Sequence, residues 1–354
     1  MTPRGTDWSL ALLVGLGFTT GLLTLFAGTP GWAWIFAAHA IGGAALALVL
    51  VWKLRRIAGR IAAPARWDRA TVFGLLALGL VAVTLGSGWL WASGITGYLA
   101  GYNLIAWHFA LGFVLGAIVL WHAAKRARRP RARDLAGRRQ FLATAGVAAG
   151  AVAAWQVQGP LARALGWRGA RRRYTGSYER GSFAGNGGFP ATSWVADAPR
   201  ELDRAEHRLA VTGKVARTLD LGVSDCERGD ELVATLDCTG GFHTTQRWRG
   251  VRLGRLLDRA GPADDAGHVR IVSHTGYRWS FPLAEARELL LATHIGDEPL
   301  DHGHGAPLRL VAPGHRGFEW VKWVTRVELH EHADLAAPAT TLLSWAGARG
   351  RGAA

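Results

Sequence analysis

Cysteine and acidic residues are both scarce in this 354-residue sequence. Its two cysteines, Cys226 and Cys238, are too few for a disulfide framework. Asp and Glu number 26 against 41 Lys and Arg, which leaves a net charge of +15. This excess does not indicate nucleic-acid binding, because the basic residues gather between long apolar runs, where they mark the cytoplasmic side of membrane proteins. The composition therefore argues against a disulfide-stapled scaffold and a nucleic-acid partner, and for a membrane protein.

Apolar residues make up 49% of the chain and are concentrated in its first 160 positions. Five runs there reach or approach the ~20 residues that a helix needs to cross a bilayer of ~30 Å. They cover residues 8–28, 32–52, 71–93, 103–123 and 141–157. Five buried helices of a soluble protein would contain less unbroken apolar sequence. We therefore predict an all-α bundle of five transmembrane helices.

The connections between these runs alternate in charge. Residues 53–69 and 124–139 are rich in Lys and Arg, whereas residues 29–31 and 94–102 carry no charge. By the positive-inside rule, the two basic connections are cytoplasmic. We therefore expect a multi-pass protein of the plasma membrane, with a cytoplasmic N-terminus and an extracytoplasmic C-terminal part.

The fifth run begins with an arginine pair, in the sequence RRQFL at residues 138–142, and continues with many Ala and Gly residues. This start resembles a twin-arginine translocation signal placed inside the chain. Such a signal implies export, by the twin-arginine machinery, of a domain that has already folded around its cofactor. The alternative is an ordinary arginine pair at the end of a basic loop.

Two histidines lie inside predicted membrane helices at similar depth. His39 is seven residues into the second run and His108 is five residues into the fourth, both counted from the outer end. An ionisable residue in a membrane helix suggests a function, and two facing imidazoles across a four-helix bundle can supply both axial ligands of one b-type haem. This part is similar to the cytochrome b subunits of respiratory enzymes, but it has only half of their haem ligands. A second haem at the depth of His122 would need a ligand near position 53 on the second run, and that residue is Lys53. The alternative role for His39 and His108 is a hydrogen bond between helices.

The second half of the chain has a different texture. Short β-prone runs at 209–213, 232–236, 269–272 and 308–311 alternate with turn residues and with predicted helices at 253–260 and 283–291. This pattern predicts an α+β domain with mixed sheets. We divide the chain into a four-helix membrane domain (1–137), a fifth transmembrane helix (138–160), a linker (161–180), the α+β domain (181–332) and a tail (333–354).

Three segments of the α+β domain carry a resemblance to a known family. They are FAGNGGFP at 183–190, LDCTGG at 236–241 followed by WRGVRL at 248–253, and HGAPLRLVAPG at 304–314 followed by VKW at 321–323. Together they resemble, in the same order, the molybdopterin-binding domain of the sulfite oxidase family. In that family a strand end delivers one cysteine to molybdenum, and the next loop carries the Trp-x-Gly-Val motif. The resemblance covers about residues 180–330.

The resemblance implies a molybdenum–molybdopterin cofactor with Cys238 as its thiolate ligand. A soft thiolate suits molybdenum that is already held by sulfur ligands of the pterin. Arg309 can form a fork on the pterin phosphate and Lys322 can offer it a point charge. The cofactor-binding residues that the family implies are Asn186, Ser273, His304, Arg309, Trp320, Val321 and Lys322.

Several features near Cys238 leave alternatives open. Tyr277 and His243 are candidate catalytic residues, but an ordinary strand tyrosine and a surface histidine fit the sequence equally well. Positive charge for an anionic substrate is available from Arg247, Arg249 and Arg316. Cys238 itself would otherwise be a buried structural thiol, or one half of a disulfide with Cys226. His304 departs from the cytochrome-free periplasmic methionine sulfoxide reductases, which have Asn at that place.

The function that the sequence indicates is a membrane-anchored molybdopterin-dependent oxidoreductase acting outside the cytoplasm. Its substrate would be sulfite, a small S- or N-oxide, or oxidised protein methionine. Electrons would pass between molybdenum and quinone, or another carrier, through an outer haem. Two alternatives remain: a binding or scaffold protein of the cell envelope that keeps the fold without redox activity, and a molybdoenzyme whose helices serve only as an anchor.

Overall fold

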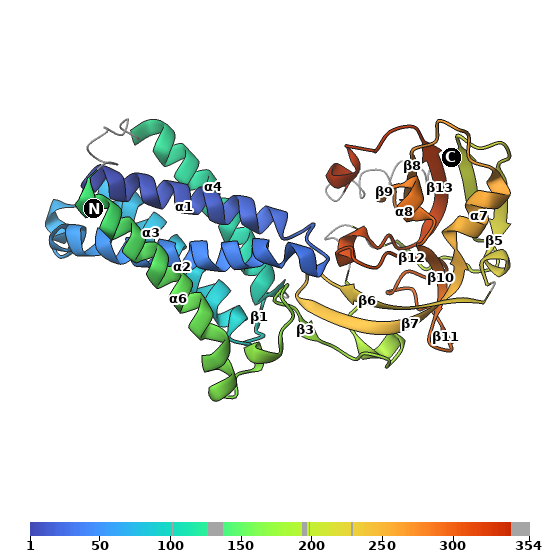
Figure 1. The fold of residues 1–354 in the computed structure, drawn as a ribbon, viewed down its shortest axis with the longest axis horizontal. Coiled ribbons are helices and arrows are strands. Elements are labelled where there is room, and N and C mark those ends of the chain that lie inside the picture. Colours follow the sequence, from blue (N-terminus) through green and yellow to red (C-terminus); the bar gives the residue numbers. More distant parts are fainter. Residues whose placement is uncertain (101, 127–136, 193–196, 198, 228, 341–354) are drawn as a thin grey trace. The chain divides into compact units, whose positions relative to one another are not determined.

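A computed structural model describes residues 1–100, 102–126, 137–192, 197, 199–227 and 229–340, without the side chains of residues 70 and 123–126. The chain divides into two compact units, Met1–Tyr178 and Glu179–Ala354. Figure 1 shows that the first unit is built mainly of helices and the second mainly of strands. Most of the second predicted basic connection, at 127–136, and the tail from 341 lie outside the described residues.

The first unit contains five long helices, as the sequence predicts. They are α1 (Pro3–Leu23), α2 (Ala33–Ile61), α3 (Arg69–Ala92), α4 (Leu104–Arg126) and α6 (Arg138–Ala164). All five are long and apolar enough to cross a membrane by length and composition. Helix α6 continues through Pro160 and ends four residues beyond the predicted boundary at 160. Short elements connect them: η1 (Pro30–Trp32), η2 (Pro64–Arg66), the hairpin β1 (Tyr98–Leu99) and β2 (Tyr102–Asn103), and η3 (Arg168–Arg171) after α6.

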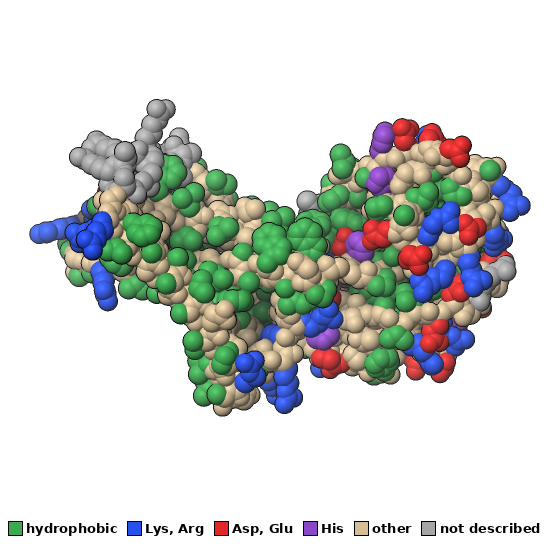
Figure 2. Space-filling model, in the orientation of Figure 1, with side chains coloured by type: hydrophobic (Ala, Val, Ile, Leu, Met, Phe, Trp, Pro, Cys, Tyr) green, Lys and Arg blue, Asp and Glu red, His purple; other side chains and the backbone are tan. Residues whose placement is uncertain are grey.

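The helical bundle has a small core and a largely apolar outer surface. Its core cluster takes one residue from each of four helices: Val14, Leu46, Val81 and Leu115. Other large hydrophobic side chains point outward, and Leu120 is 71% exposed. Figure 2 shows hydrophobic side chains spread along the outer surface of this unit. A bundle that is apolar outside as well as inside is consistent with membrane insertion.

The second unit contains two sheets. In the six-stranded sheet the path is β11 (Glu298–Pro299), β10 (Leu290–Ile295), β7 (Phe242–Arg252) and β3 (Tyr178–Glu179), with β12 (Arg309–Val311) paired to β10 and β6 (Asp230–Asp237) paired to β7. In the five-stranded sheet the order is β5 (Leu219–Gly222), β4 (Arg208–Gly213), β13 (Val324–His330), β8 (His268–Ser273) and β9 (Arg278–Pro282). Strands β13 and β4 are parallel, whereas β13 and β8 are antiparallel. The sheet is therefore mixed, as the sequence predicts.

Short helices complete this unit. They are α7 (Leu253–Ala260), α8 (Leu283–Ala286), η4 (Asn186–Gly188), η5 (Val223–Cys226), η6 (Gly317–Glu319) and η7 (Ala337–Ala339). The predicted helix at 253–260 is confirmed as α7. The predicted helix at 283–291 is wrong in its second half, because α8 ends at Ala286 and β10 begins at Leu290. Leu290 and Leu291 are completely buried between β7 and β12, so tertiary pairing prevails over the local helical pattern.

The Trp-x-Gly-Val motif lies in a strand and not in the expected loop. Trp248, Gly250 and Val251 belong to β7, which pairs with β6 on one side and β10 on the other. A Cβ atom on Gly250 would lie 2.0 Å from the Leu291 carbonyl oxygen. Glycine is therefore required there because the two strands approach closely.

Candidate functional site

Cys238 directly follows β6, as the family resemblance predicts for the metal ligand. Its backbone N–H donates to the Phe242 carbonyl oxygen at 2.8 Å, which closes the turn between β6 and β7. Its Sγ accepts a bond from the Gly240 N–H at 3.3 Å and lies 3.4 Å from Thr192 Oγ1. The residue is 8% exposed, so the thiol is sheltered and held by local donors.

Cys238 is not bonded to the other cysteine. Both cysteines are buried thiols outside any disulfide, and Cys226 lies in η5 after β5, a strand of the other sheet. The alternative of a Cys226–Cys238 disulfide is therefore wrong. Cys238 remains available as a ligand.

Arg309 is a buried cation on β12. Its guanidinium carbon lies 5.3 Å from the ring centre of Trp248 and 5.7 Å from that of Trp320, so two aromatic rings shield it. Nη1 donates to the His304 carbonyl oxygen at 2.9 Å, and the buried Nε has no hydrogen-bond acceptor. Burial lowers the pKa of Arg309 to about 10, against the opposing effect of Cys238 and Asp301. The side chain therefore remains a cation near neutral pH.

Lys322 is a second cation in the same region. Its Nζ donates to the carbonyl oxygens of Thr192, at 2.7 Å, and of Gly303. Burial and the positive charge of Arg309 together lower the pKa of Lys322 to about 7, against the opposing effect of Cys238 and two carboxylates. Among the described residues neither Arg309 nor Lys322 forms a salt bridge. Arg309 is buried and Lys322 is partly buried, and neither is ion-paired among the described residues, so the two side chains suit an anionic ligand.

Next to these cations, His304 presents a buried hydrogen-bond acceptor. Asp301 Oδ1 accepts bonds from the His304 backbone N–H, at 2.7 Å, and from Nδ1, at 2.8 Å. A carboxylate only accepts, so the proton of the neutral ring is on Nδ1 and Nε2 carries a lone pair. Nε2 is buried without a partner, and the ring lies 4.2 Å from that of Phe189. Burial lowers the pKa of His304, which favours this neutral form, although Asp301 opposes the shift.

Three other predicted residues position this site through their neighbours. Asn186 donates to the Pro299 carbonyl oxygen at 2.9 Å and accepts from the Asp301 N–H at 3.1 Å, so it holds the segment that carries Asp301. The Val321 carbonyl oxygen accepts from Leu310 N–H at 2.7 Å, and its side chain is fully buried. Trp320 Nε1 donates to the His315 carbonyl oxygen at 3.3 Å while its ring packs under Arg309.

Ser273 and Tyr277 lie at the two ends of the turn between β8 and β9. Ser273 Oγ is 3.1 Å from Thr275 Oγ1 and bonds its N–H, so it stabilises the turn. The Tyr277 hydroxyl donates to the Phe318 carbonyl oxygen at 2.6 Å, and Phe318 belongs to η6. A Cβ on Gly317, in the same η6, would lie 3.0 Å from the Cys238 Cα. Tyr277 therefore supports a segment that packs on Cys238.

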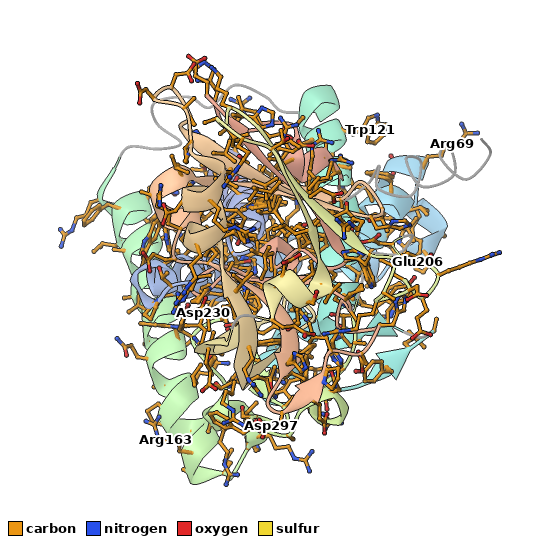
Figure 3. The ribbon with its side chains drawn as sticks, turned by 90° about the vertical axis from the view of Figure 1, so that its right-hand side faces the viewer. Arg69, Trp121, Arg163, Glu206, Asp230 and Asp297 are labelled. Atoms are coloured by element: carbon orange, nitrogen blue, oxygen red, sulfur yellow. The ribbon has the colours of Figure 1, made fainter. Side chains whose placement is uncertain are left out.

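His243 lies near the start of β7. Residues in a strand alternate between faces, so His243, Arg247 and Arg249 lie on the face opposite to Trp248. Arg247 and Arg249 pair with Asp297 at 2.9 and 3.2 Å, in the turn between β10 and β11, where Figure 3 labels Asp297. The structure thus places His243 on the face away from the tryptophan that shields Arg309.

Sequence reasoning missed three contributors to this site. Asp301 precedes His304 by three residues, a spacing that could have indicated its role. Thr192 contacts both Cys238 and Lys322, but no motif marks it. Asp197 is 5% exposed and its Oδ1 has no partner; burial raises its pKa, while Thr275 and Lys322 oppose that change.

The two histidines of the predicted membrane helices face each other in the helical unit. The ring centres of His39, on α2, and His108, on α4, are 6.0 Å apart. The Thr20 hydroxyl uses its single hydrogen to donate to the Leu16 carbonyl oxygen at 2.6 Å. Thr20 Oγ1 therefore accepts the hydrogen bond from His39 Nδ1–H at 3.0 Å. His108 Nδ1 lies 2.9 Å from the Thr84 carbonyl oxygen, which also only accepts. Both neutral rings therefore carry their proton on Nδ1, which leaves Nε2 free to act as a metal ligand.

Glycines allow the neighbouring helices to approach these rings. A Cβ on Gly21 of α1 would lie 3.3 Å from His39 Cε1, and a Cβ on Gly88 of α3 would lie 2.8 Å from His108 Cε1. In the first pair of helices, α2 carries His39, and α1 supplies the Thr20 hydroxyl and Gly21. In the second pair, α4 carries His108, and α3 supplies the Thr84 carbonyl and Gly88. His122 is placed differently, since its ring stacks on Phe73 at 6.1 Å.

Comparison with known proteins defines the class of the second unit. Residues 195–337 match the family described as the oxidoreductase molybdopterin binding domain. The two cations, the ring acceptor and the sheltered thiol fit a cofactor with a phosphate, a hydrogen-bonding ring and a thiophilic metal. The second unit is therefore similar, over residues 195–337, to molybdopterin-binding oxidoreductase domains.

Individual relatives agree with this class. The chain is 33% identical over 162 residues to the mitochondrial sulfite oxidase of Mus musculus, covering 36% of this chain and 30% of that protein. It is 30% identical over 148 residues to the protein-methionine-sulfoxide reductase catalytic subunit MsrP of Gluconobacter oxydans, covering 35% and 47%. The uncharacterized oxidoreductase YuiH of Bacillus subtilis is 29% identical over 139 residues, covering 38% and 70%.

These matches are partial. The chain spans less than a third of the length of the mouse sulfite oxidase and about half that of the reductase subunit. A solved structure, the sulfane dehydrogenase SoxCD from Paracoccus pantotrophus, is 28% identical with a TM-score of 0.36, covering 38% of this chain and 40% of that one. The matched family segment does not include the helical unit.

Proposed function

We propose that this chain is a membrane-anchored molybdopterin-dependent oxidoreductase that acts on a small oxidised-sulfur or sulfite-like substrate outside the cytoplasm. The observation that carries the proposal is a pair of cations without a salt bridge, the buried Arg309 and the partly buried Lys322, close to the Cys238 thiol. Thr192 links them, because its hydroxyl lies 3.4 Å from Cys238 Sγ and its carbonyl accepts from Lys322 Nζ. The mammalian sulfite oxidases and the bacterial methionine-sulfoxide reductase subunits among the relatives support this substrate class.

Each residue of the site has a chemical task in this proposal. Arg309 and Lys322 bind the phosphate of the pterin, and the two rings over Arg309 exclude water from that contact. His304 Nε2 accepts a hydrogen bond from a ring N–H, with its tautomer held by Asp301. Cys238 supplies the protein thiolate for molybdenum. When bound, the cofactor supplies two-electron exchange with the substrate.

The helical unit would serve electron transfer as well as anchoring. In the proposal His39 and His108 would hold one b-type haem, and that group would supply single-electron exchange with quinone or another carrier. Their fixed Nδ1–H tautomers support this assignment, as do the glycines beside both rings.

Topology and export are part of the same proposal. Helix α6 begins at Arg138 and Arg139, both exposed. We take this pair as a twin-arginine signal that places the second unit outside, with the N-terminus in the cytoplasm. Fusion of an epitope to each end, followed by protease treatment of intact and opened cells, tests the orientation.

Metal analysis combined with a reduced-minus-oxidised spectrum tests the proposed function. The purified full chain should contain about one molybdenum and show a b-type haem. Cys238→Ser should remove molybdenum and leave the haem spectrum, whereas Cys226→Ala, at the other buried cysteine, should keep both. Molybdenum without a haem spectrum would indicate that the helices serve only as a membrane anchor. A chain with neither cofactor would be an envelope scaffold, and would overturn the proposal.

A further inference from the structure

A cleft of about 410 Å³ lies in the helical unit, where the C-terminal end of α3 meets α6 and the segment after it. Its lining includes Ala92, Trp155, Gln156, Gln158, Arg172 and Tyr174. All of these belong to the unit Met1–Tyr178. The volume falls in the range of about 300–1,000 Å³ that small-molecule sites occupy.

The polar side chains of the cleft lining include two amides and one guanidinium. Gln156 and Gln158 place two amides on a helix whose neighbouring residues are apolar, including the exposed Val157 and Leu161. The Arg172 guanidinium lies 4.1 Å over the Trp91 ring, and its Nη1 donates to a backbone carbonyl at 2.8 Å. Its Nε is buried without an acceptor.

Burial lowers the pKa of Arg172, although Tyr178 opposes this effect. A second guanidinium, that of Arg163, folds back along α6 to within 3.7 Å of the place of a Cβ on Gly159, another lining residue. Figure 3 labels Arg163 at this end of α6. The cleft thus offers N–H donors from both glutamine amides and from Arg172, beside an indole ring.

The cleft is also close, along the chain, to the histidine pair. Ala92 follows Gly88 by four residues of α3, about 6 Å of helix, and Gly88 is the glycine that meets His108. Gln158 follows Arg138 by twenty residues, about 30 Å of helix, so it lies a bilayer thickness away from the arginine pair. The cleft therefore sits at the level where an apolar bundle meets the interface.

We propose that this cleft binds the headgroup of a membrane quinone. A quinone is a flat ring with carbonyl acceptors on opposite edges, which suit N–H donors such as the Arg172 guanidinium and the Gln158 amide in the cleft lining, while Trp155 offers an aromatic face. Its apolar tail can lie along Val157 and Leu161. An anionic phospholipid fits less well, because the Arg172 Nη1 is engaged and the guanidinium face is covered by Trp91. The inference deepens the proposed function by locating its electron carrier.

Photoaffinity labelling of the full chain in lipid nanodiscs tests this binding site. The probe is a short-tailed azidoquinone, and labelled peptides are identified by mass spectrometry with and without an excess of unlabelled quinone. We expect label within residues 155–174 that the unlabelled quinone removes. Gln158→Leu should lower it at least tenfold. Gln140→Leu, at the other end of α6, is the matched control and should label like the parent chain.

Three results would overturn the inference. One is label spread evenly over the apolar surface of the bundle, and another is label displaced by anionic phospholipid but not by quinone. The third is equal labelling of the Gln158→Leu and Gln140→Leu variants when both show the parent's unfolding temperature. The labelling requires neither molybdenum nor haem, so it fails or succeeds separately from the metal analysis and the difference spectrum that test the proposed function.

Discussion

Arg316 and Asp237 form a buried ion pair one residue away from Cys238. Arg316 Nη1 donates to Asp237 Oδ1 at 2.8 Å, and the side chains are 6% and 3% exposed. The pair joins the end of β6 to the segment before η6, whose Gly317 packs on the Cys238 Cα. The positive charge of Arg316, which sequence alone could not place, is thus neutralised by Asp237, and the pair fixes the backbone that presents the thiol.

Breaking this pair should cost far more than breaking an exposed one. Asp237→Asn leaves a buried, uncompensated guanidinium, so we expect a loss of about 3–5 kcal/mol in the free energy of unfolding and a lower molybdenum content. The control is Asp297→Asn, since Asp297 pairs with Arg247 and Arg249 at the surface and such pairs contribute less than about 1 kcal/mol. Denaturant unfolding of both variants measures the difference. Equal losses would show that burial does not determine the contribution of the pair.

Lys322 should make cofactor uptake depend on pH. Burial and the charge of Arg309 lower its pKa to about 7 in the cofactor-free protein, so the cation is present below pH 7 and is lost as pH rises through 7. Uptake of molybdopterin should therefore fall between pH 6 and pH 8.5. Lys322→Met should take up less cofactor at every pH and show a flatter profile. If Lys322→Met keeps the parent's pH profile, the pH dependence of cofactor uptake comes from another titrating group.

The hydroxyl of Thr20 should determine how well His39 binds a haem. Thr20→Val removes the acceptor that holds His39 Nδ1, and loss of such a partner typically costs about 10- to 100-fold in metal affinity. Thr20→Ser should restore binding. Thr19→Val, at the adjacent exposed position, is the control. Haem content and the midpoint potential from a redox titration are the measurements, and a Thr20→Val protein with the parent's values for both would contradict the assignment.

His315 should make the second unit less stable in alkaline solution. Burial acts to lower the pKa of His315, but Glu319 Oε1, 3.1 Å from Nδ1, and Glu285 together raise it to about 9. A pKa raised above the ordinary value of about 6.5 gives stability that is fully present below pH 6.5 and is lost as pH rises through 9. The effect should reach up to about 3 kcal/mol. Denaturant unfolding from pH 6.5 to 9.5 measures it.

The matched variant for this prediction is His315→Gln, which keeps hydrogen-bonding groups but cannot hold a proton. Its stability should change much less over the same pH range. A slope as steep as that of the parent chain would place the titrating group elsewhere, and would leave the contact of His315 with Phe281 as its main structural role.

Local patterns in the sequence predicted much of this protein. Five apolar runs predicted five helices, because helix length and hydropathy are properties of one contiguous segment. Short β-prone runs that alternate with turn residues predicted β4, β6, β8 and β12. The family resemblance of the LDCTGG segment predicted that Cys238 lies at a strand end. Their equal depth along two predicted helices indicated that His39 and His108 lie at the same level, and their rings are 6.0 Å apart.

Tertiary structure determined what depends on neighbours from distant parts of the chain. Residues 283–291 have a helical pattern, yet Leu290 and Leu291 form a strand because β7 and β12 enclose them. Three contacts illustrate this: Asp301 sets the tautomer of His304, Thr20 sets the tautomer of His39, and Asp237 neutralises Arg316. None of these pairings has a sequence signature, because each is a single contact made by folding. The residue types of the cofactor site could therefore be read from the sequence, whereas their burial, protonation and partners follow only from the packing around Cys238.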